Sequence, residues 1–481
     1  MNVAQSGIRE TRDYRQAGPH RKHCVAEVTR PRVDRTLSSR HRSLTRHALP
    51  TWRESSLAPL VKVHLTRRAE EMAWYSVTQA YPLKFSNSLL LVSTGVSMSL
   101  GSFVIRPLPL LVFGAGSSRN LATQVRSLGF GAALVVTDAG LAKTKVIAGI
   151  VEGLQAAGIT TELFAGVEPN PTDLNVTKGA AALKSLGDAV VVPVGGGSSM
   201  DCAKAIALLA RNPGTVQELQ ANPNAAAGAP VIAVPTTAGT GSETNSACVI
   251  TNTSLGRKTY VMHPSIVPKI SVLDPELTVA LPRYPTATCA FDVFTHATEA
   301  FTSNRTTPYS DAVALQAIRL VVANATKALA SGDDIEVRSN LLLASCMAAI
   351  AFNVSGLGAC HGTGHPLSAR LNAAHGQTLA TMMPHVMGYN LDVVASRYAE
   401  VAGVFGVADA SASAERNARA AIEAVTAWRA ELGLAKSIRE LGGSDNLLPM
   451  LIEDSLADPV NFSNPKPLDA AAFEGLFRAA W

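Results

Sequence analysis

The chain has 481 residues, 47% of them hydrophobic and 5% aromatic, so it can bury a sizeable core and is long enough for two domains of ordinary size. Its net charge of +5 is unevenly distributed, because residues 1–97 hold 16 Lys+Arg and 7 Asp+Glu, which leaves 26 and 30 for residues 98–481. The body is therefore mildly acidic, and its charge gives no support for a nucleic-acid-binding surface. Six cysteines without CxxC or framework spacing indicate reduced thiols and a cytoplasmic location.

Residues 1–97 form an arginine-rich leader without sustained helical or strand periodicity. Three interpretations compete: a targeting peptide, a nucleic-acid-binding arm, or a segment outside the mature protein. Interspersed acidic residues and the lack of an apolar face weigh against the first. The apolar run at 89–96 is too short to span a bilayer. Because orderly patterning begins at Met98, we expect the functional chain to start there and the leader to be disordered or non-native.

Residues 98–282 alternate short aliphatic runs with longer amphipathic segments that are joined by glycines. This alternation predicts βαβ units and a mostly parallel sheet, as in a nucleotide-binding domain. After about residue 283 the β-branched runs stop, and segments such as 310–330, with Ser310 as the expected N-cap, repeat at helical spacing. We therefore expect an α/β domain over 98–282 and an all-helical domain over 283–481.

A strand, three glycines and a helix follow one another in VVVPVGGGSSMDCAKAIALL (190–209). Glycines let the backbone approach closely, and the free N–H groups and positive dipole end of a helix suit a pyrophosphate. Such a loop can be an ordinary strand-to-helix turn, but a second run of hydroxyls and glycines, PTTAGTGSE (235–243), also follows an aliphatic strand. The phosphate-binding candidates are Gly195, Gly196, Gly197 and Ser198.

Asp138 ends the predicted strand ALVVTD. An acid at this position can accept hydrogen bonds from both ribose hydroxyls of NAD and would repel the 2′-phosphate of NADP. This interpretation predicts a preference for NAD. The alternative, that Asp138 only caps the next helix, is equally compatible with the sequence.

Four of the eleven histidines lie within residues 353–390, among glycines, alanines and aliphatic residues with almost no charge. Upstream, Asp292 and His296 are four residues apart, which places them on one face of a helix. A carboxylate with neutral imidazoles suits Fe(II) or Zn(II), which would act as a Lewis acid on a substrate oxygen. The candidate ligands are Asp292, His296, His361 and His375. The alternative is a scatter of satisfied polar groups, and His385 is interpreted as a packed helix histidine.

The motifs that carry these candidates resemble those of the iron-containing, or group III, alcohol dehydrogenases. They are GGGSSMDCAK, PTTAGTGSE, TATCAFDVFTHATEAF and GLGACHGTGHPLSARLNAAHGQTLATMMPHVMGYN. The resemblance covers about residues 98–481. It implies a dehydroquinate synthase-like fold, with an α/β domain that binds NAD(P), a helical domain that holds one divalent metal, and an active site in the cleft between them.

The resemblance also assigns individual residues. It implies the full metal-ligand set named above, with His361 serving in catalysis as well. His365 matches a residue near the nicotinamide and substrate, and Lys258 matches a lysine that reaches the cofactor. The residues that match the family's second cofactor-binding run are Thr236, Thr237 and Thr240.

Two stretches depart from the family pattern. Ala290 and Phe291 stand where the family usually has Gly-Met, and residues 368–370 replace a Gly-rich stretch. We expect both departures to lie near the substrate and to bear on substrate choice.

These observations predict a metal-dependent alcohol dehydrogenase that transfers hydride reversibly between a primary or small alcohol and NAD. The resemblance favours Fe(II) over Zn(II) and a homodimer or larger assembly, with neither a nucleic acid nor a membrane as partner. One alternative is a metal-independent reductase of the same fold, resembling the maleylacetate reductases, against which the complete ligand set argues. Another is a non-catalytic nucleotide-binding protein.

Overall fold

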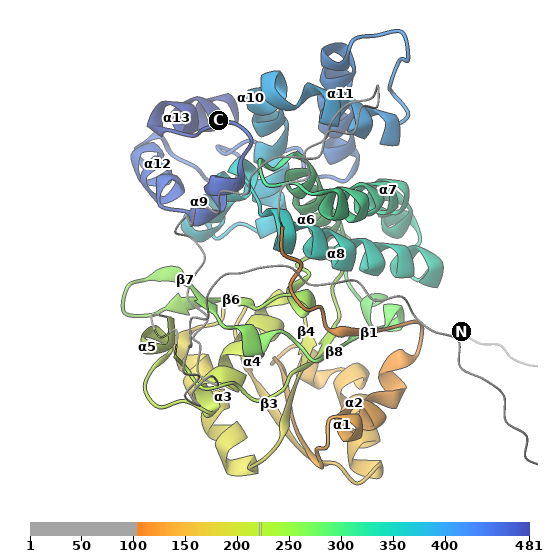
Figure 1. Ribbon diagram of the computed structural model, residues 1–481, viewed down its shortest axis with the longest axis vertical. Coiled ribbons are helices and arrows are strands. Elements are labelled where there is room, and N and C mark those ends of the chain that lie inside the picture. Colours follow the sequence, from red (N-terminus) through yellow and green to blue (C-terminus); the bar gives the residue numbers. More distant parts are fainter. Residues whose placement is uncertain (1–102, 221, 223) are drawn as a thin grey trace, which may run out of the picture. The chain divides into compact units, whose positions relative to one another are not determined.

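The computed structural model describes residues 103–481 apart from residues 221 and 223 (Figure 1). The predicted leader, residues 1–97, lies outside the described residues. The five cysteines within the described part of the chain are free thiols.

Six strands form one parallel sheet in the order β1-β8-β5-β4-β2-β3. They are β1 (Leu110–Phe113), β2 (Ala132–Asp138), β3 (Thr160–Val167), β4 (Val190–Gly195), β5 (Ile232–Pro235) and β8 (Ile270–Leu273). The predicted parallel sheet is thereby confirmed. The sequence analysis did not predict the separate antiparallel hairpin of β6 (Ala247–Asn252) and β7 (Arg257–Met262).

Helices cover both faces of the sheet, with α1 and α2 on one side of the strands and α3 on the other (Figure 1). Their bounds are α1 (Leu121–Ser127), α2 (Lys145–Ala156), α3 (Asp173–Leu186), α4 (Gly197–Ala210) and α5 (Val216–Gln220). Successive residues of a strand face opposite sides of a sheet. Accordingly, Leu134 and Val136 join the core that includes α3 and α4, whereas Ala133 and Val135 join the core that includes α1 and α2. Burial on both faces explains the unbroken aliphatic runs of these strands.

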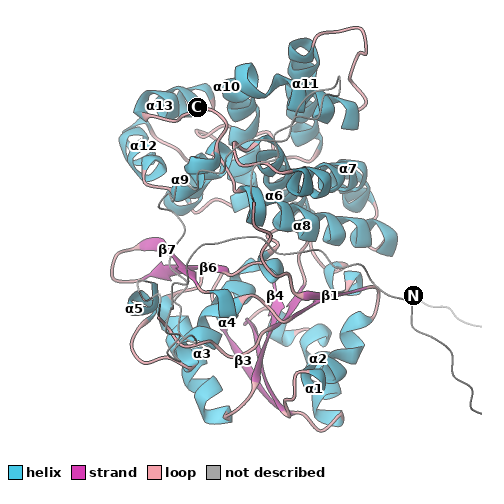
Figure 2. Cartoon of the chain, viewed as in Figure 1, coloured by secondary structure: helices cyan, strands magenta, loops and turns pink. Residues whose placement is uncertain are grey.

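The described residues after β8 form helices and no strands (Figure 2). The helices are α6 (Arg283–Thr302), α7 (Pro308–Ala330), α8 (Ile335–Ser355), α9 (Ala359–Leu371), α10 (His375–Val404), α11 (Ala414–Glu431), α12 (Leu448–Leu456) and α13 (Ala470–Ala479). The predicted helical second half is confirmed. The expected N-cap at Ser310 was wrong: Thr307 caps α7, and Ser310 completes a capping box, because Pro308 suits the first helical position.

Helix α6, most of whose residues are buried, lies at the centre of the helical half (Figure 1). Phe291 and Phe294 pack against Trp428 of α11, with ring centroids 5.5 and 5.2 Å apart. Aromatic pairs of this kind add to the free energy gained from burial. This packing fixes the helix that carries Asp292 and His296.

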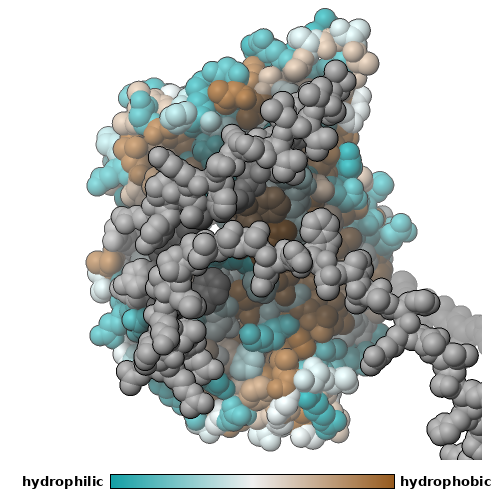
Figure 3. Space-filling model, in the orientation of Figure 1, coloured by the Kyte–Doolittle hydropathy of each residue, from teal (hydrophilic) through white to brown (hydrophobic). Residues whose placement is uncertain are grey.

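Two of the described helices, α7 and α8, are long and apolar enough to cross a bilayer on length and composition alone. Both contribute side chains to the largest hydrophobic core of the structure, including Ile318 and Leu342. Packing within this core accounts for their apolar composition. On the face drawn in Figure 3, apolar and polar residues are intermixed outside the grey atoms.

Candidate active site

The four predicted metal ligands converge on one point in the helical half. Asp292 and His296 lie one turn apart on α6, and His296 Nε2 is 3.4 Å from Asp292 Oδ1. His361, in the first turn of α9, and His375, the first residue of α10, place their Nε2 atoms 3.6 and 3.7 Å from the same oxygen. Three imidazole nitrogens therefore surround one carboxylate oxygen.

This arrangement fits a divalent cation. Ligand atoms bonded to one tetrahedral ion at 2.0–2.2 Å lie roughly 3.3–3.6 Å apart, close to the three distances from Asp292 Oδ1. The ligand atoms of Asp292, His361 and His375 all lie within 4.8 Å of one another, and His296 adjoins this group through Asp292 Oδ1. Asp292 Oδ1 and His361 Nε2 are buried and make no hydrogen bond among the described residues. An unsatisfied buried polar atom costs about 1–3 kcal/mol. A cation that accepts both lone pairs would remove that cost.

Glu299, which the sequence analysis missed, orients His361 from the same helix as Asp292. Its Oε2 lies 2.5 Å from His361 Nδ1, and its Oε1 accepts a hydrogen bond of 2.6 Å from the backbone N–H of Cys360. This contact would keep the proton of His361 on Nδ1 when a cation is bound, which would free the Nε2 lone pair that faces Asp292 for the cation. The signal that could have revealed Glu299 is its position three residues after His296, on the same face of α6.

The protonation states of three of these four groups suit metal binding, and His361 is the exception. Burial lowers the pKa of His296 to about 4 and that of His375 well below its usual range, so both imidazoles are neutral at pH 7. Burial alone would raise the pKa of Asp292, but the facing imidazoles hold it at about 2. Burial also opposes protonation of His361, yet Glu299 and Asp292 raise its pKa to about 9. Cation binding at His361 Nε2 would therefore release a proton.

His365 lies beside this centre without facing Asp292. Its ring stacks on that of His375, with centroids 5.3 Å apart and an interplanar angle of 16°. Its Nδ1 is 2.7 Å from Asp458 Oδ2 and 3.5 Å from the hydroxyl of Tyr260 on β7. The sequence analysis identified neither Asp458 nor Tyr260 as a site residue.

The two glycine- and hydroxyl-rich runs of the α/β half are in contact. Strands β4 and β5 pair in parallel with Gly195 opposite Pro235, so the segments that follow them leave the same edge of the sheet. A Cβ atom added at Gly197, the first residue of α4, would lie 2.8 Å from Thr240 Cγ2, and one at Gly196 would lie 3.2 Å from Thr237 Cγ2. The helix start and the threonine run therefore lie side by side, and the first N–H groups of a helix can bind an anion such as a pyrophosphate.

Two other residues of these runs have structural partners. The hydroxyl of Ser198 donates to the carbonyl of Pro169 at 2.5 Å. The N–H of Thr236, which is 8% exposed, donates to the carbonyl of Gly195 at 2.9 Å and extends the strand pairing by one residue. Ser198 and Thr236 thus shape the turn through contacts within the protein.

Asp138 accepts hydrogen bonds from the turn that follows it, and its role toward the ribose of NAD stays a prediction. It is the last residue of β2, and its Oδ1 accepts hydrogen bonds from the N–H groups of Gly140 and Leu141 at 2.8 and 2.9 Å. Its Oδ2 makes no hydrogen bond to the described residues, so it can accept one from a ribose hydroxyl. Lys258 is exposed on β7, two residues before Tyr260 and therefore on the same face of that strand.

The run 235–243 connects the phosphate-binding candidates to the metal-binding helix. A Cβ atom at Gly239 would lie 2.9 Å from the Sγ of Cys289, three residues before Asp292. Farther along, the side chain of Asn353 on α8 donates to the carbonyl of Thr244 at 3.3 Å. The segment that follows β5 therefore contacts both α6, which carries Asp292, and α8.

The two departures from the family pattern serve packing. Phe291 is fully buried and stacks on Trp428, so the expectation that it lies near the substrate was wrong; an aromatic residue on that face of α6 fills the helical core. In the second stretch, Ser368 donates to the carbonyl of Ala373 and Arg370 pairs with Asp454 at 2.6 Å. These contacts stabilise the end of α9.

Comparison with known protein families gives two matches that together span most of the described chain. Residues 109–275 match the family "Iron-containing alcohol dehydrogenase". Residues 286–481 match "Fe-containing alcohol dehydrogenase family, C-terminal".

Individual relatives agree with these matches. The chain is 35% identical to the 1,3-propanediol dehydrogenase of Klebsiella pneumoniae over 77% of this chain and 96% of the relative. It is 34% identical to the NAD-dependent methanol dehydrogenase of Bacillus methanolicus over 74% and 94%, respectively. It is 32% identical to the lactaldehyde reductase of Escherichia coli (strain K12) over 77% and 97%.

Solved structures show the same architecture. A 1,3-propanediol oxidoreductase is 34% identical and superimposes with a TM-score of 0.77 over 79% of this chain and all of that one. A sulfoacetaldehyde reductase from Bifidobacterium kashiwanohense, solved in complex with NAD+, is 25% identical with a TM-score of 0.71 over 79% of this chain and 99% of that one. With its parallel-sheet and helical halves and its cluster of ligand-type side chains, the chain belongs to the iron-containing alcohol dehydrogenase family and is an oxidoreductase.

Proposed function

We propose that this protein is an NAD-dependent, metal-dependent alcohol dehydrogenase that transfers hydride reversibly between a primary or small alcohol and NAD. The observation that carries the proposal is the set of three imidazole nitrogens within 3.7 Å of Asp292 Oδ1. In this proposal residues 98–282 form the NAD-binding domain and residues 283–481 the metal-binding domain. A bound divalent cation would polarise the substrate oxygen as a Lewis acid.

The chain's own residues supply the remaining functions. Gly195 to Gly197 and the start of α4 would hold the pyrophosphate, as a helix N-terminus with free N–H groups does. Asp138, through its free Oδ2, would hold the ribose and favour NAD over NADP. His365, which is not part of the ligand cluster, would take the hydroxyl proton of the alcohol or of the ribose.

The donor set of one carboxylate and three imidazoles suits Fe(II) and Zn(II), and we propose Fe(II) because the matched family is iron-containing. Three relatives are named for small oxygenated compounds, namely 1,3-propanediol, methanol and lactaldehyde. We therefore propose a short alcohol or diol, and the corresponding aldehyde in reverse, as the substrate class. A cytoplasmic homodimer or larger assembly completes the proposal.

The competing activity within this fold is a metal-independent reductase. A protein of that kind has no use for buried ligand-type side chains that lack hydrogen-bond partners, whereas Asp292 and His361 keep such atoms here. This observation favours the metal-dependent reaction.

The test is a panel of methanol, ethanol, 1-butanol, 1,2-propanediol and 1,3-propanediol, each assayed with NAD and with NADP after loading with Fe(II) or Zn(II). We expect NADH formation with at least one short alcohol and a preference for NAD. The proposal would be wrong if the loaded protein bound NAD but neither oxidised any alcohol of the panel nor reduced the matching aldehydes.

A further inference from the structure

The two carboxylate oxygens of Asp458 contact two different nitrogen atoms, one of the backbone and one of a histidine ring. It lies between α12 and the short 3-10 helix η7 (Pro459–Ser463), and its side chain is 9% exposed. Its Oδ1 accepts a hydrogen bond of 3.1 Å from the N–H of Val460, and its Oδ2 lies 2.7 Å from His365 Nδ1. Since an ionised carboxylate only accepts hydrogen bonds, Nδ1 of His365 must carry the proton.

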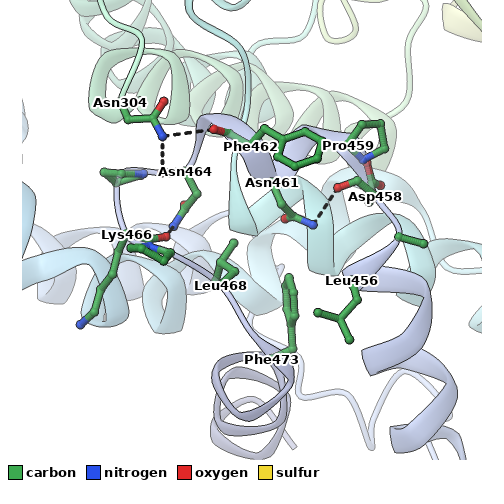
Figure 4. A pocket seen from close by; sticks show the side chains of 13 residues that line it. Asn304, Leu456, Asp458, Pro459, Asn461, Phe462, Asn464, Lys466, Leu468 and Phe473 are labelled. Carbon is green, nitrogen blue, oxygen red and sulfur yellow. Dashed lines mark hydrogen bonds between the residues drawn. The ribbon is translucent and has the colours of Figure 1, made fainter. Parts of the chain in front are cut away.

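The turn that carries Asp458 is held rigidly against α9. The side-chain amide of Asn461 donates to the carbonyl of Asp458 at 2.9 Å (Figure 4) and to that of Ser455 at 2.6 Å, which closes the turn. A Cβ atom at Gly362 would lie 1.9 Å from Asn461 Oδ1, so the turn and α9 are in direct contact there. Residues three apart share one face of a helix. The turn that touches Gly362 thus presents Asp458 to His365.

The same segment borders a pocket of about 350 Å³, which Leu456, Leu468 and Phe473 line on its apolar side (Figure 4). None of the metal or cofactor candidates lines this pocket. Asp458 therefore lines the pocket and also contacts His365. Its contacts with His365 and with the N–H of Val460 hold the carboxylate in place.

The competing partner of His365 is weaker. The Tyr260 hydroxyl is 3.5 Å from His365 Nδ1, at the outer limit of a hydrogen bond, whereas the carboxylate contact of 2.7 Å is short and charge-assisted. Asp458 thus decides which ring nitrogen is protonated. The other nitrogen, Nε2, makes no hydrogen bond to the described residues, and the side chain is 26% exposed.

We propose that Asp458 is a positioning residue that keeps His365 in the Nδ1–H tautomer, so that Nε2 can accept the hydroxyl proton released during alcohol oxidation. This inference rests on the proposed function. As hydride leaves the substrate carbon for NAD, the O–H bond breaks and an N–H bond forms at Nε2. Asp458 stays ionised beside the imidazolium, which then passes the proton to water. The arrangement follows the logic by which a carboxylate orients the histidine of a catalytic triad.

The decisive variant is Asp458→Asn. The Val460 N–H requires an acceptor, so the new amide oxygen would face Val460 and the amide N–H group would face His365. His365 Nδ1 would then have to accept the hydrogen bond from this amide, and the proton of the neutral imidazole ring would move to Nε2. We expect kcat to fall about 100-fold or more, as for loss of a general base, while KM for NAD and metal content change less than about threefold.

The tautomer can be measured directly by ¹⁵N NMR of histidine-labelled full chain loaded with diamagnetic Zn(II), with His365 assigned from a His365→Gln sample. The wild type should show a protonated Nδ1 and an unprotonated Nε2, and Asp458→Asn the reverse. An Nε2–H tautomer in the wild type would overturn the inference, even if the variant failed to fold.

Two further variants separate positioning from a general structural role. Asp458→Glu keeps a carboxylate and should restore kcat to within about tenfold of the wild type. Asp454→Asn, on the neighbouring helix α12, also removes one negative charge, but it affects only the ion pair with Arg370. The tautomer of His365 and kcat should therefore not change.

Equal losses in the Asp458→Glu and Asp458→Asn proteins, or loss of metal together with kcat, would assign Asp458 a structural role and overturn the inference. A wild type that forms no NADH from any alcohol would instead contradict the proposed function. The tautomer measurement would still report on Asp458 in that case.

Discussion

The two halves of the described chain form their parts of the site in opposite ways, one with glycines that lack side chains and the other with buried polar side chains. In the α/β half the site depends on missing atoms: Gly196 and Gly197 lie so close to Thr237 and Thr240 that even a methyl group would be crowded. In the helical half it depends on side chains that are costly to bury, such as Asp292 and His361, which are 4% and 1% exposed. The first kind of site is damaged by adding an atom, the second by removing one.

The comparison also separates the expected consequences. Backbone N–H groups at the start of α4 are fixed by the fold, so changes there should weaken cofactor binding and leave the metal in place. The histidines and Asp292 have no cofactor-binding role in this account, so changes there should abolish metal binding and leave NAD affinity intact. The variants at His361, Gly197 and Asp138 test whether the two functions separate in this way, and the variant at Glu243 tests a buried carboxyl of the α/β half.

The largest effect is expected for His361→Ala. It removes one of the four proposed ligands and leaves Glu299 and Asp292 buried without the imidazole that contacts both of them. We expect loss of most bound metal and a fall in turnover of about 1,000-fold or more, with NAD affinity within about threefold of the wild type. Elemental analysis, initial rates and NADH fluorescence titration measure the three quantities.

His385→Ala is the matched control, since His385 lies on α10 outside the ligand cluster. Its metal content should equal that of the wild type. If NAD affinity collapsed together with metal content in His361→Ala but not in the control, the two halves would not be separable.

The next effect concerns Gly197→Ala. The added Cβ would lie 2.8 Å from Thr240 Cγ2, so either α4 or the threonine run must shift. We expect NAD to bind about tenfold more weakly, equivalent to about 1.4 kcal/mol, at unchanged metal content. Isothermal titration of NAD measures the affinity. Gly149→Ala, on α2 where the added Cβ meets nothing within 4 Å, should bind NAD normally.

A smaller effect is expected at Asp138. Asp138→Gly removes both the turn cap and the charge, whereas Asp138→Asn keeps an acceptor for the N–H groups of Gly140 and Leu141 and removes only the charge. Both variants should lower the ratio of NAD to NADP efficiency, by about tenfold if the charge is worth about 1.4 kcal/mol. Steady-state kinetics with both cofactors give the ratio. An unchanged ratio in both variants would leave Asp138 as a capping residue only.

The smallest effect is a pH dependence of stability at Glu243, which belongs to the α/β run but has a buried carboxyl. Burial raises its pKa to about 7, although its backbone hydrogen bond and Lys204 oppose the shift. Because the pKa of Glu243 is higher in the folded than in the unfolded protein, folding favours the protonated carboxyl. The folded state therefore keeps its full stability below pH about 4.5 and loses part of it as the pH rises to about 7.

Glu243→Gln should therefore remove this loss and stabilise the protein at pH 8 by on the order of 2 kcal/mol relative to the wild type. Melting temperatures of both proteins between pH 5 and 8 measure the difference. If the difference in melting temperature did not grow with pH, the account of Glu243 would be wrong, and the carboxyl would be ionised over the whole range with its charge balanced by Lys204.

Much of this organisation could be predicted from the sequence because it depends on local patterns. Aliphatic runs separated by amphipathic segments predicted a parallel sheet with intervening helices, and the histidine-rich stretch supplied two of the ligand candidates that the fold brings to Asp292. Asp458 could not be found this way, because it contacts His365 across 93 residues of sequence separation. Phe291 was misjudged because an apolar residue beside a ligand can face the core as well as the substrate.

The most direct test of the central claim is a titration of metal-stripped full-length protein with Fe(II), followed by the rate of NADH formation from the best alcohol of the panel. The account predicts almost no turnover before addition and a linear rise that saturates at one Fe(II) per chain, because Asp292 and its three histidines form a single site. Full turnover in the stripped protein would contradict it.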